Sequence, residues 1–136
     1  MSYFLAKTDP DTYSIGDFER EKQTTWDGVT NAQAVRVIRD MKKGDRVFVY
    51  HSGGESMILG MAKVVSEPRT DPKNPKSAIV DLAFTGRLDP PTTLAEVKQS
   101  GRFNDWALVR QSRLSTMAAP EEFVLWMQAR YPKAKI

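Results

Sequence analysis

Few side chains in this sequence are able to do covalent chemistry. There is no cysteine and one histidine, His51, which excludes thiol nucleophiles, zinc–thiolate sites and metal centres built from several histidines. Ser52 follows His51, but neighbouring residues of a strand point to opposite faces, and the sequence places no carboxylate to orient the imidazole. The aspartates stand near predicted turns and caps, where this side chain bonds the backbone. The sequence therefore indicates no catalytic dyad or triad, and the only metal site left open is a carboxylate site for a hard cation.

The segment TTWDGVTNAQAVRV, residues 24–37, carries the strongest indication of a binding site. Trp26 stands before an Asp-Gly turn, outside any periodic apolar pattern, and Asn31 follows five residues later. One interpretation is that Trp26 plugs the core beside a turn, which the residues alone slightly favour. The other is that Trp26 is one wall of a nucleobase pocket, because stacking on a base contributes about 1–3 kcal/mol. Asn31 would then offer a donor and an acceptor to a base edge. Trp106 and Trp126 are expected to be packing residues.

Composition places the chain among ordinary globular proteins. Its 136 residues are 40% hydrophobic and 27% charged, with a net charge of +3, which suits one domain and permits nucleic-acid binding without requiring it. Two groups of cations stand close together in the sequence; each taken alone is best interpreted as a solvated face or a helix C-terminus. The first group is Arg36, Arg39, Lys42, Lys43 and Arg46, and the second is Arg110 and Arg113.

The N-terminus has no basic region followed by an apolar run, and no apolar stretch approaches the ~20 residues that span a bilayer. We therefore expect a cytoplasmic protein without a membrane partner.

Apolar periodicity predicts a mixed α and β domain without regular β-α alternation. Strands are predicted over residues 3–7, 45–52, 57–65, 79–87 and 114–117, with the second and third antiparallel and Gly60 marking a bulge. HSGGES lacks the ending of a phosphate loop and predicts a hairpin turn, while the proline-rich residues 67–77 are predicted to be a loop.

Helices are predicted over residues 14–21 and 32–41, after Thr93, and from Pro120 as a first helical residue. Ser14, Thr30 or Asn31, and Thr93 with Glu96 are the expected caps, and Gly101 the stop of the third helix. Two buried faces are expected, one of Ala34, Val37, Ile38 and Met41 and the other of Phe123, Trp126, Met127 and Arg130.

Three stretches together resemble the EVE domain family: KTDPDTYSIGDF, WDGVTNAQAVRVIRDMKKGDRVFVYHSG and LVRQSRLS. They occur in the family's order, and the resemblance extends from Tyr3 through the C-terminal helix. That family belongs to the PUA-like barrels and is related to the YTH domains that read methylated adenine in RNA. The resemblance implies one domain over residues 1–136 with an α+β fold: a small, curled, mostly antiparallel PUA-like β-barrel with helices packed over its ends.

In function, the resemblance implies a non-catalytic module without a cofactor or metal, which binds a flipped-out, modified nucleobase in DNA or RNA. We expect Trp26 to stack on the base, Asn31 and Ser52 to bond its edges, and Lys7 or Arg113 to hold a phosphate. The residues that match the family's motifs are Lys7 and Thr8 in K-[ST]-x-P, Trp26, Gly28 and Asn31 in W-D-G-V-x-N, Tyr50, His51 and Ser52 in Y-H-S, and Arg113 and Ser115 in R-L-S.

Two other functions are kept as alternatives. One is an enzyme that acts on a nucleotide or small polar ligand with His51 as general base, and the other is a protein-interaction module. The chain also departs from the family pattern in three places, which bear on ligand selectivity. It has Thr8-Asp9 in place of Ser-Glu, Ala32 in place of an aromatic residue, and a shortened segment EPRTDPKNPKSA before the third long strand.

Overall fold

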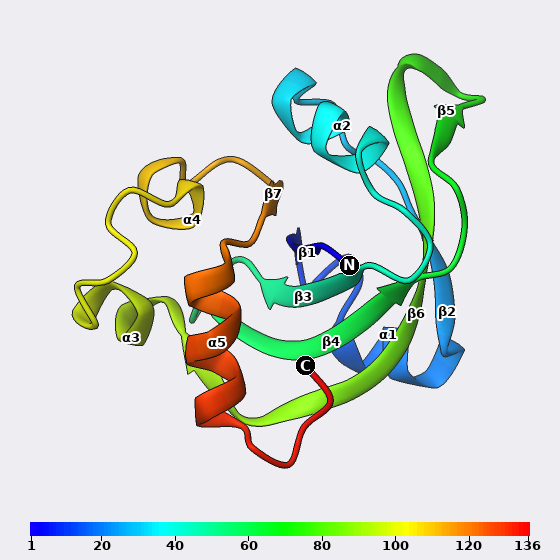
Figure 1. Cartoon of the computed structure of the whole chain (residues 1–136). Helices are drawn as coiled ribbons and strands as arrows, with labels where there is room; N and C mark the ends of the chain where they lie inside the picture. Colours follow the sequence, from blue (N-terminus) through cyan, green and yellow to red (C-terminus); the bar gives the residue numbers. More distant parts are fainter.

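The computed structural model describes all residues, 1–136, and its seven strands form one curled sheet with helices around it (Figure 1). The strand order is β2-β6-β4-β3-β1-β7, and β5 pairs with β6 beside this path. β1 runs parallel to β3, and all other pairs are antiparallel. The strands are β1 Tyr3–Thr8, β2 Gln23–Trp26, β3 Arg46–His51, β4 Met57–Val64, β5 Arg69–Asp71, β6 Asn74–Thr93 and β7 Thr116–Ala118.

The α+β class and the mostly antiparallel, curled sheet are as predicted, but the sheet does not close into the predicted barrel. β2 and β7 stand at opposite ends of the strand order and do not pair with each other. Both are short, with four and three residues, so they leave the curled sheet open. A closed barrel needs every edge paired, and these two strands end as edges.

The predicted loop over residues 67–77 is also wrong, because this segment forms a hairpin. β5 pairs with the first part of β6, with Arg69 opposite Ile79 and Thr70 opposite Ala78. Prolines are tolerated here because they occupy the turn and the edge of the sheet. β6 is 20 residues long, far longer than the predicted strand over residues 79–87, and register shifts against β4 let it bend around the sheet.

The helices are α1 Ile15–Glu21, α2 Ala32–Arg39, α3 Leu94–Gln99, α4 Ala107–Arg110 and α5 Glu121–Arg130. The predicted caps are confirmed: Ser14 and Thr93 form capping boxes, and the Asn31 side chain caps α2. Pro120 is the N-cap of α5 and not its first helical residue. α4 was not predicted, because four residues are too few to show a helical period. None of the five helices has the length and the apolar composition that spanning a bilayer requires.

One core of 33 buried residues lies between the concave sheet and the helices. On α2 the buried stripe includes Val35, while the predicted Val37 is only half-buried. On α5 Phe123 and Met127 are buried as predicted, and Trp126 packs against the core while remaining partly exposed. Trp106 packs on the ring of Phe123 with centroids 4.4 Å apart, which confirms it as a packing residue.

The predicted bulge at Gly60 is confirmed, and this glycine leaves room for a side chain of α1. The pairing of β4 with β6 shifts register between Ile58 and Gly60. A Cβ atom at Gly60 would stand 2.6 Å from Cδ1 of Ile15 and 3.3 Å from the carbonyl oxygen of Gly86. Ile15 is buried and is the first residue of α1, so the missing side chain at residue 60 leaves the space in which the end of the Ile15 side chain packs.

Gly60→Ala should therefore destabilise the protein by about 1–3 kcal/mol, the usual cost of an extra group in a packed core. Gly86→Ala is the matched control on the neighbouring strand, because an added Cβ there meets nothing within 4 Å. Urea unfolding of the two variants measures the difference. Equal free energies of unfolding would show that Ile15 does not depend on the space at Gly60.

Candidate functional site

A pocket of about 580 Å³, open to solvent, lies where the end of β1, the loop after it and the end of β2 meet. It is lined by Lys7, Thr8, Asp9, Thr12, Tyr13, Glu21, Thr24, Thr25, Trp26, Asp27 and Gly28. Four residues from the sequence prediction are thus brought together here: Lys7, Thr8, Trp26 and Gly28. The other six, Asn31, Tyr50, His51, Ser52, Arg113 and Ser115, lie outside the lining.

The parallel pairing of β1 with β3 places the pocket at one edge of the sheet. In this register Lys7 lies opposite Tyr50 and Thr8 opposite His51. The chain leaves β1 at Thr8, whose hydroxyl donates to the carbonyl of Tyr13 at 2.7 Å. The backbone amide of Ile15 then donates to Nε2 of His51 at 2.9 Å. These two bonds fold residues 9–13 back over the strand ends and bring Tyr13 into the lining.

Trp26 belongs to both the core and the pocket. Its side chain packs against Phe18, with ring centroids 6.1 Å apart, and nearly perpendicular to Tyr13 at 6.4 Å. Only 8% of the residue is exposed, so Trp26 is mainly a core plug that presents an edge to the pocket. The indole N–H has no partner within the chain, and since no buried polar atom is left unpaired, this group reaches solvent.

Tyr13 is the pocket aromatic that the sequence analysis missed. Its hydroxyl donates to Oε1 of Glu21 at 2.7 Å, which fixes the ring. Burial and the bond to Glu21 raise the pKa of Tyr13 to about 12, so the phenol stays protonated at neutral pH. The available signal was an aromatic residue between the TDPD turn and the Ser14 cap, inside one of the stretches that resemble the family.

Lys7 ties the pocket to a loop distant in the sequence. Its ammonium group donates to the carbonyl of Ser112 at 3.0 Å and lies 5.3 Å from the ring centroid of Tyr50. Burial lowers the pKa of Lys7, and no carboxylate forms an ion pair with it. The amide of Lys7 also donates to Ser115 at 2.8 Å. Ser115 therefore holds this loop beside β1, and Arg113 between them is exposed without an ion pair.

Asn31, Tyr50 and Ser52 serve the framework in this structure. Asn31 is exposed, and its side-chain oxygen accepts from the amide of Ala34 at 3.1 Å, which leaves its NH₂ group without an intrachain partner. Tyr50 is buried beneath Lys7. The amide of Ser52 donates to Thr8 at 2.9 Å, and its hydroxyl donates to the same carbonyl at 3.3 Å.

His51 is arranged as a neutral acceptor. Its Nε2 lone pair is occupied by the amide of Ile15. Burial, and then the charge of Arg87, lower the pKa of His51. An imidazole whose lone pair is already bonded to the backbone is poorly placed to take a proton from a substrate. No group of three or more His, Asp or Glu side chains is placed to hold a metal ion.

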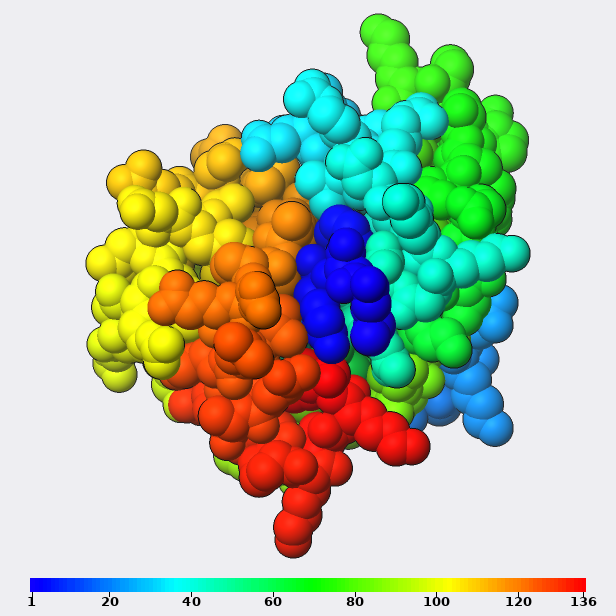
Figure 2. Space-filling view, in the orientation of Figure 1, coloured from blue at the N-terminus to red at the C-terminus, as the bar shows by residue number.

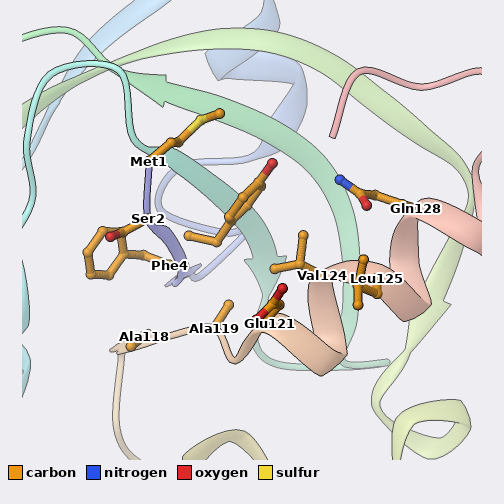
Figure 3. A pocket seen from close by; sticks show the side chains of 10 residues that line it. Met1, Ser2, Phe4, Ala118, Ala119, Glu121, Val124, Leu125 and Gln128 are labelled. Carbon is orange, nitrogen blue, oxygen red and sulfur yellow. The ribbon is translucent and has the colours of Figure 1, made fainter.

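A second cavity, of about 500 Å³, lies between the start of β1 and α5. Figure 3 shows Leu125 and Gln128 of α5 across from Met1 and Ser2. The lining is mostly apolar, and its one titratable side chain that carries a charge at neutral pH is Glu121. Ligand sites use a few convergent polar groups to orient what they bind, and the pocket at Tyr13 and Trp26 has far more of them.

Two departures from the family pattern lie away from the pocket lining. Ala32 is the first residue of α2 and is exposed. The shortened segment forms the β5–β6 hairpin, none of whose residues lines the pocket. The third departure, Thr8-Asp9, does lie in the lining.

Comparison with known proteins identifies the relatives of this chain. The model of the EVE domain family matches residues 2–129. Human thymocyte nuclear protein 1 is 32% identical over 170 residues, which cover 96% of this chain and 76% of that protein.

Three solved structures show the same fold. A Rhodopseudomonas palustris protein, solved by NMR, has a TM-score of 0.89 and 31% identity, with 99% of this chain and 97% of that chain covered. Human THYN1 protein in complex with 5-methylcytosine-containing DNA has a TM-score of 0.88 and 26% identity, with 99% and 100% covered. The YTH domain of Mmi1 has a TM-score of 0.57 and 16% identity over 98% of this chain and 91% of that chain, a likeness of fold alone.

The bond between His51 and α1 should make stability depend on pH. The pKa of folded His51 lies below the ordinary value of 6.5, so the unfolded chain binds a proton more readily than the folded one. The contribution of His51 is complete above about pH 6.5 and is lost as pH falls toward the folded pKa. Unfolding free energies measured between pH 7.5 and 5 should decline, and in His51→Gln this decline should disappear. An equal decline in that variant would assign the effect to another group.

Proposed function

Because the chain belongs to the EVE domain family, we propose that it binds nucleic acid by receiving a modified base, turned out of its strand, in the pocket beside Tyr13 and Trp26. The observation that carries the proposal is the likeness over 99% of this chain to human THYN1 protein, which was solved with DNA containing 5-methylcytosine. The pocket volume of about 580 Å³ falls within the range of small-molecule sites, roughly 300–1,000 Å³.

The two aromatic side chains take different parts in this proposal. With 8% of its surface exposed, Trp26 cannot offer a whole ring face without moving out of the core. Tyr13 is half-buried and fixed by Glu21, so its ring is the surface on which a base stacks. Trp26 contributes an edge and one free N–H donor. We therefore assign the stacking role, which the sequence analysis expected of Trp26, mainly to Tyr13.

The polar lining suits a base that carries an exocyclic amino group. Asp9, Glu21 and Asp27 all line the pocket, and ionised carboxylates only accept hydrogen bonds. One oxygen of Asp9 is used by the amide of Asp11, and one of Glu21 by Tyr13, which leaves the others available. Cytosine and adenine present amino donors, whereas thymine presents a carbonyl oxygen in the same place. A methylated cytosine therefore fits this lining better than thymine.

Groups at the rim complete the proposed site. The NH₂ group of Asn31 has no partner within the chain, and Asn31 stands three residues after Gly28 of the lining. Arg113 is exposed on the loop that Lys7 holds, where a phosphate of the bound strand can approach. The module is proposed to act without catalysis, since the lone pair of His51 is bonded to the chain itself.

Binding to DNA and RNA oligonucleotides that differ only in one cytosine, 5-methylcytosine or thymine tests this function. We expect the wild type to bind the methylated strand most tightly. Tyr13→Leu removes the ring but keeps apolar bulk, and should weaken this binding roughly 5–150-fold, the equivalent of one stacked base. Trp26→Phe should preserve the packing of the core. It should reduce the preference for the methylated strand, because the larger indole edge and its N–H donor are lost.

Trp126→Phe is the control, because Trp126 is a partly exposed tryptophan on α5, outside the pocket. It should leave binding unchanged. If the wild type binds no modified strand in preference to its unmodified match, or if Tyr13→Leu and Trp126→Phe behave alike, the pocket is not the site.

A further inference from the structure

The cations of α2 and of the turn after it have no carboxylate partners. The structure contains six ion pairs, and none involves a residue between α2 and the start of β3. We call this surface the basic face; it consists of Arg36, Arg39, Lys42, Lys43, Arg46 and the adjacent Lys63. In Figure 2 the segment around α2, coloured cyan, lies on the surface next to the blue N-terminus. Arg46 is half-buried, and the other five are exposed.

The segment from Arg36 to Arg46 contains two acids, and one of them is committed to the backbone. Asp45 is buried, and its two oxygens accept from the amides of Ser2 at 3.0 Å and Lys42 at 2.9 Å. Its carboxylate is thus committed to the backbone of the turn. Asp40 is the one exposed acid within the segment, and it forms no ion pair.

Lys63 joins the basic face through the sheet. The amide of Gly44 donates to the carbonyl of Val64 at 2.9 Å, and the amide of Val64 donates to the carbonyl of Asp45 at 2.8 Å. These bonds hold the turn after α2 against the end of β4. Arg46 is directly opposite Lys63 in the β3–β4 pair, where like charges reduce stability. The folded chain alone gains nothing from this pairing, which points to an anionic partner.

The basic face is also within reach of the pocket. Asn31 caps α2 three residues after Gly28 of the pocket lining, and Arg36 lies about one turn into the helix. From the reach of an extended chain and the rise of a helix, Arg36 stands at most about 18 Å from Gly28. That is the length of about five nucleotides along a duplex. Arg36 and Arg39 are three residues apart, so they share one helix face.

We infer that the basic face binds the phosphate backbone of the nucleic acid whose base enters the pocket. Charge complementarity selects this partner, since six neighbouring cations with one exposed acid among them match a chain of phosphates. This role rests on the proposed function for the identity of the polyanion. The basic face contributes affinity and positions the strand, and it does not distinguish one base from another.

The test compares two variants that lose the same charge at different places. The face variant is Arg36→Gln/Lys42→Gln/Lys43→Gln, whose three side chains are exposed and form no ion pair. The control is Lys98→Gln/Lys133→Gln/Lys135→Gln, also exposed and unpaired. Affinities for methylated and unmethylated oligonucleotides are measured from 50 to 200 mM salt. Thermal unfolding checks both folds, and the double variant Arg36→Gln/Lys43→Gln serves if the triple variant does not fold.

In the face variant the slope of log K against log salt should fall by about 2–3, close to one for each phosphate that no longer meets a cation. The ratio between methylated and unmethylated strands should stay as in the wild type. Equal slopes in the face variant and the control would overturn the inference, because only net charge would then matter. A wild type that shows no preference for the methylated base, but whose slope falls in the face variant alone, would reject the pocket function and leave the basic face standing.

Discussion

The parallel pairing of β1 with β3 is the constraint on which the site depends. Parallel neighbours end at the same edge of a sheet, so Thr8 and His51 finish side by side. The chain must then leave β1 and return to begin α1, and it does so over these two residues. The amide of Ile15 bonded to His51 anchors the return, and Gly60 leaves the space in which Ile15 packs. Tyr13 stands just before this anchor, so its place in the pocket follows from a strand register and a bulge.

The pocket shares its walls with the core, which limits how it can change. Trp26 closes the end of β2 against Phe18 and Tyr13, and Trp26 also lines the pocket. Removing so large a buried ring costs a core about 3–5 kcal/mol, so a truncation of Trp26 confounds loss of function with loss of fold. The half-buried Tyr13 is the wall that can vary more freely. Trp26 is therefore both a core residue and part of the pocket wall.

Local patterns were sufficient to predict most elements of this fold. Ser14, Asn31 and Thr93 cap helices where the sequence shows a capping residue, because a cap is decided by its own few residues. The hairpin of β5 and β6 could not be foreseen in the same way, since its prolines indicate a loop unless the segment is known to lie at a sheet edge. Whether the sheet closes into a barrel likewise depends on which strands pair, and no local sequence pattern indicates this.

The candidate site was predictable to a lesser degree than the fold. Lys7, Thr8, Trp26 and Gly28 line one pocket, and their role in binding stays a prediction. The same resemblance named His51 and Ser52, whose side chains bond α1 and β1 in this structure. A family motif does not distinguish residues that would contact a ligand from residues whose side chains stabilise the surrounding structure. Tyr13 escaped notice because its place depends on a hydrogen bond from Thr8 to its carbonyl.

Charge is divided between the two surfaces in a way that suits an extruded base. Asp9, Glu21 and Asp27 line the pocket beside the single cation Lys7, so a phosphate is disfavoured inside while an amino group is accepted. The cations of the basic face begin beyond the first turn of α2, and none of them forms an ion pair with these acids. Extruding a base from a duplex costs a few kcal/mol, and one stacked aromatic returns only about 1–3 kcal/mol. Under the proposed function, the energy of stacking in the pocket therefore roughly equals the cost of extruding the base, and phosphate contacts outside the pocket supply the net affinity. In that proposal one surface selects the base and the other holds the strand.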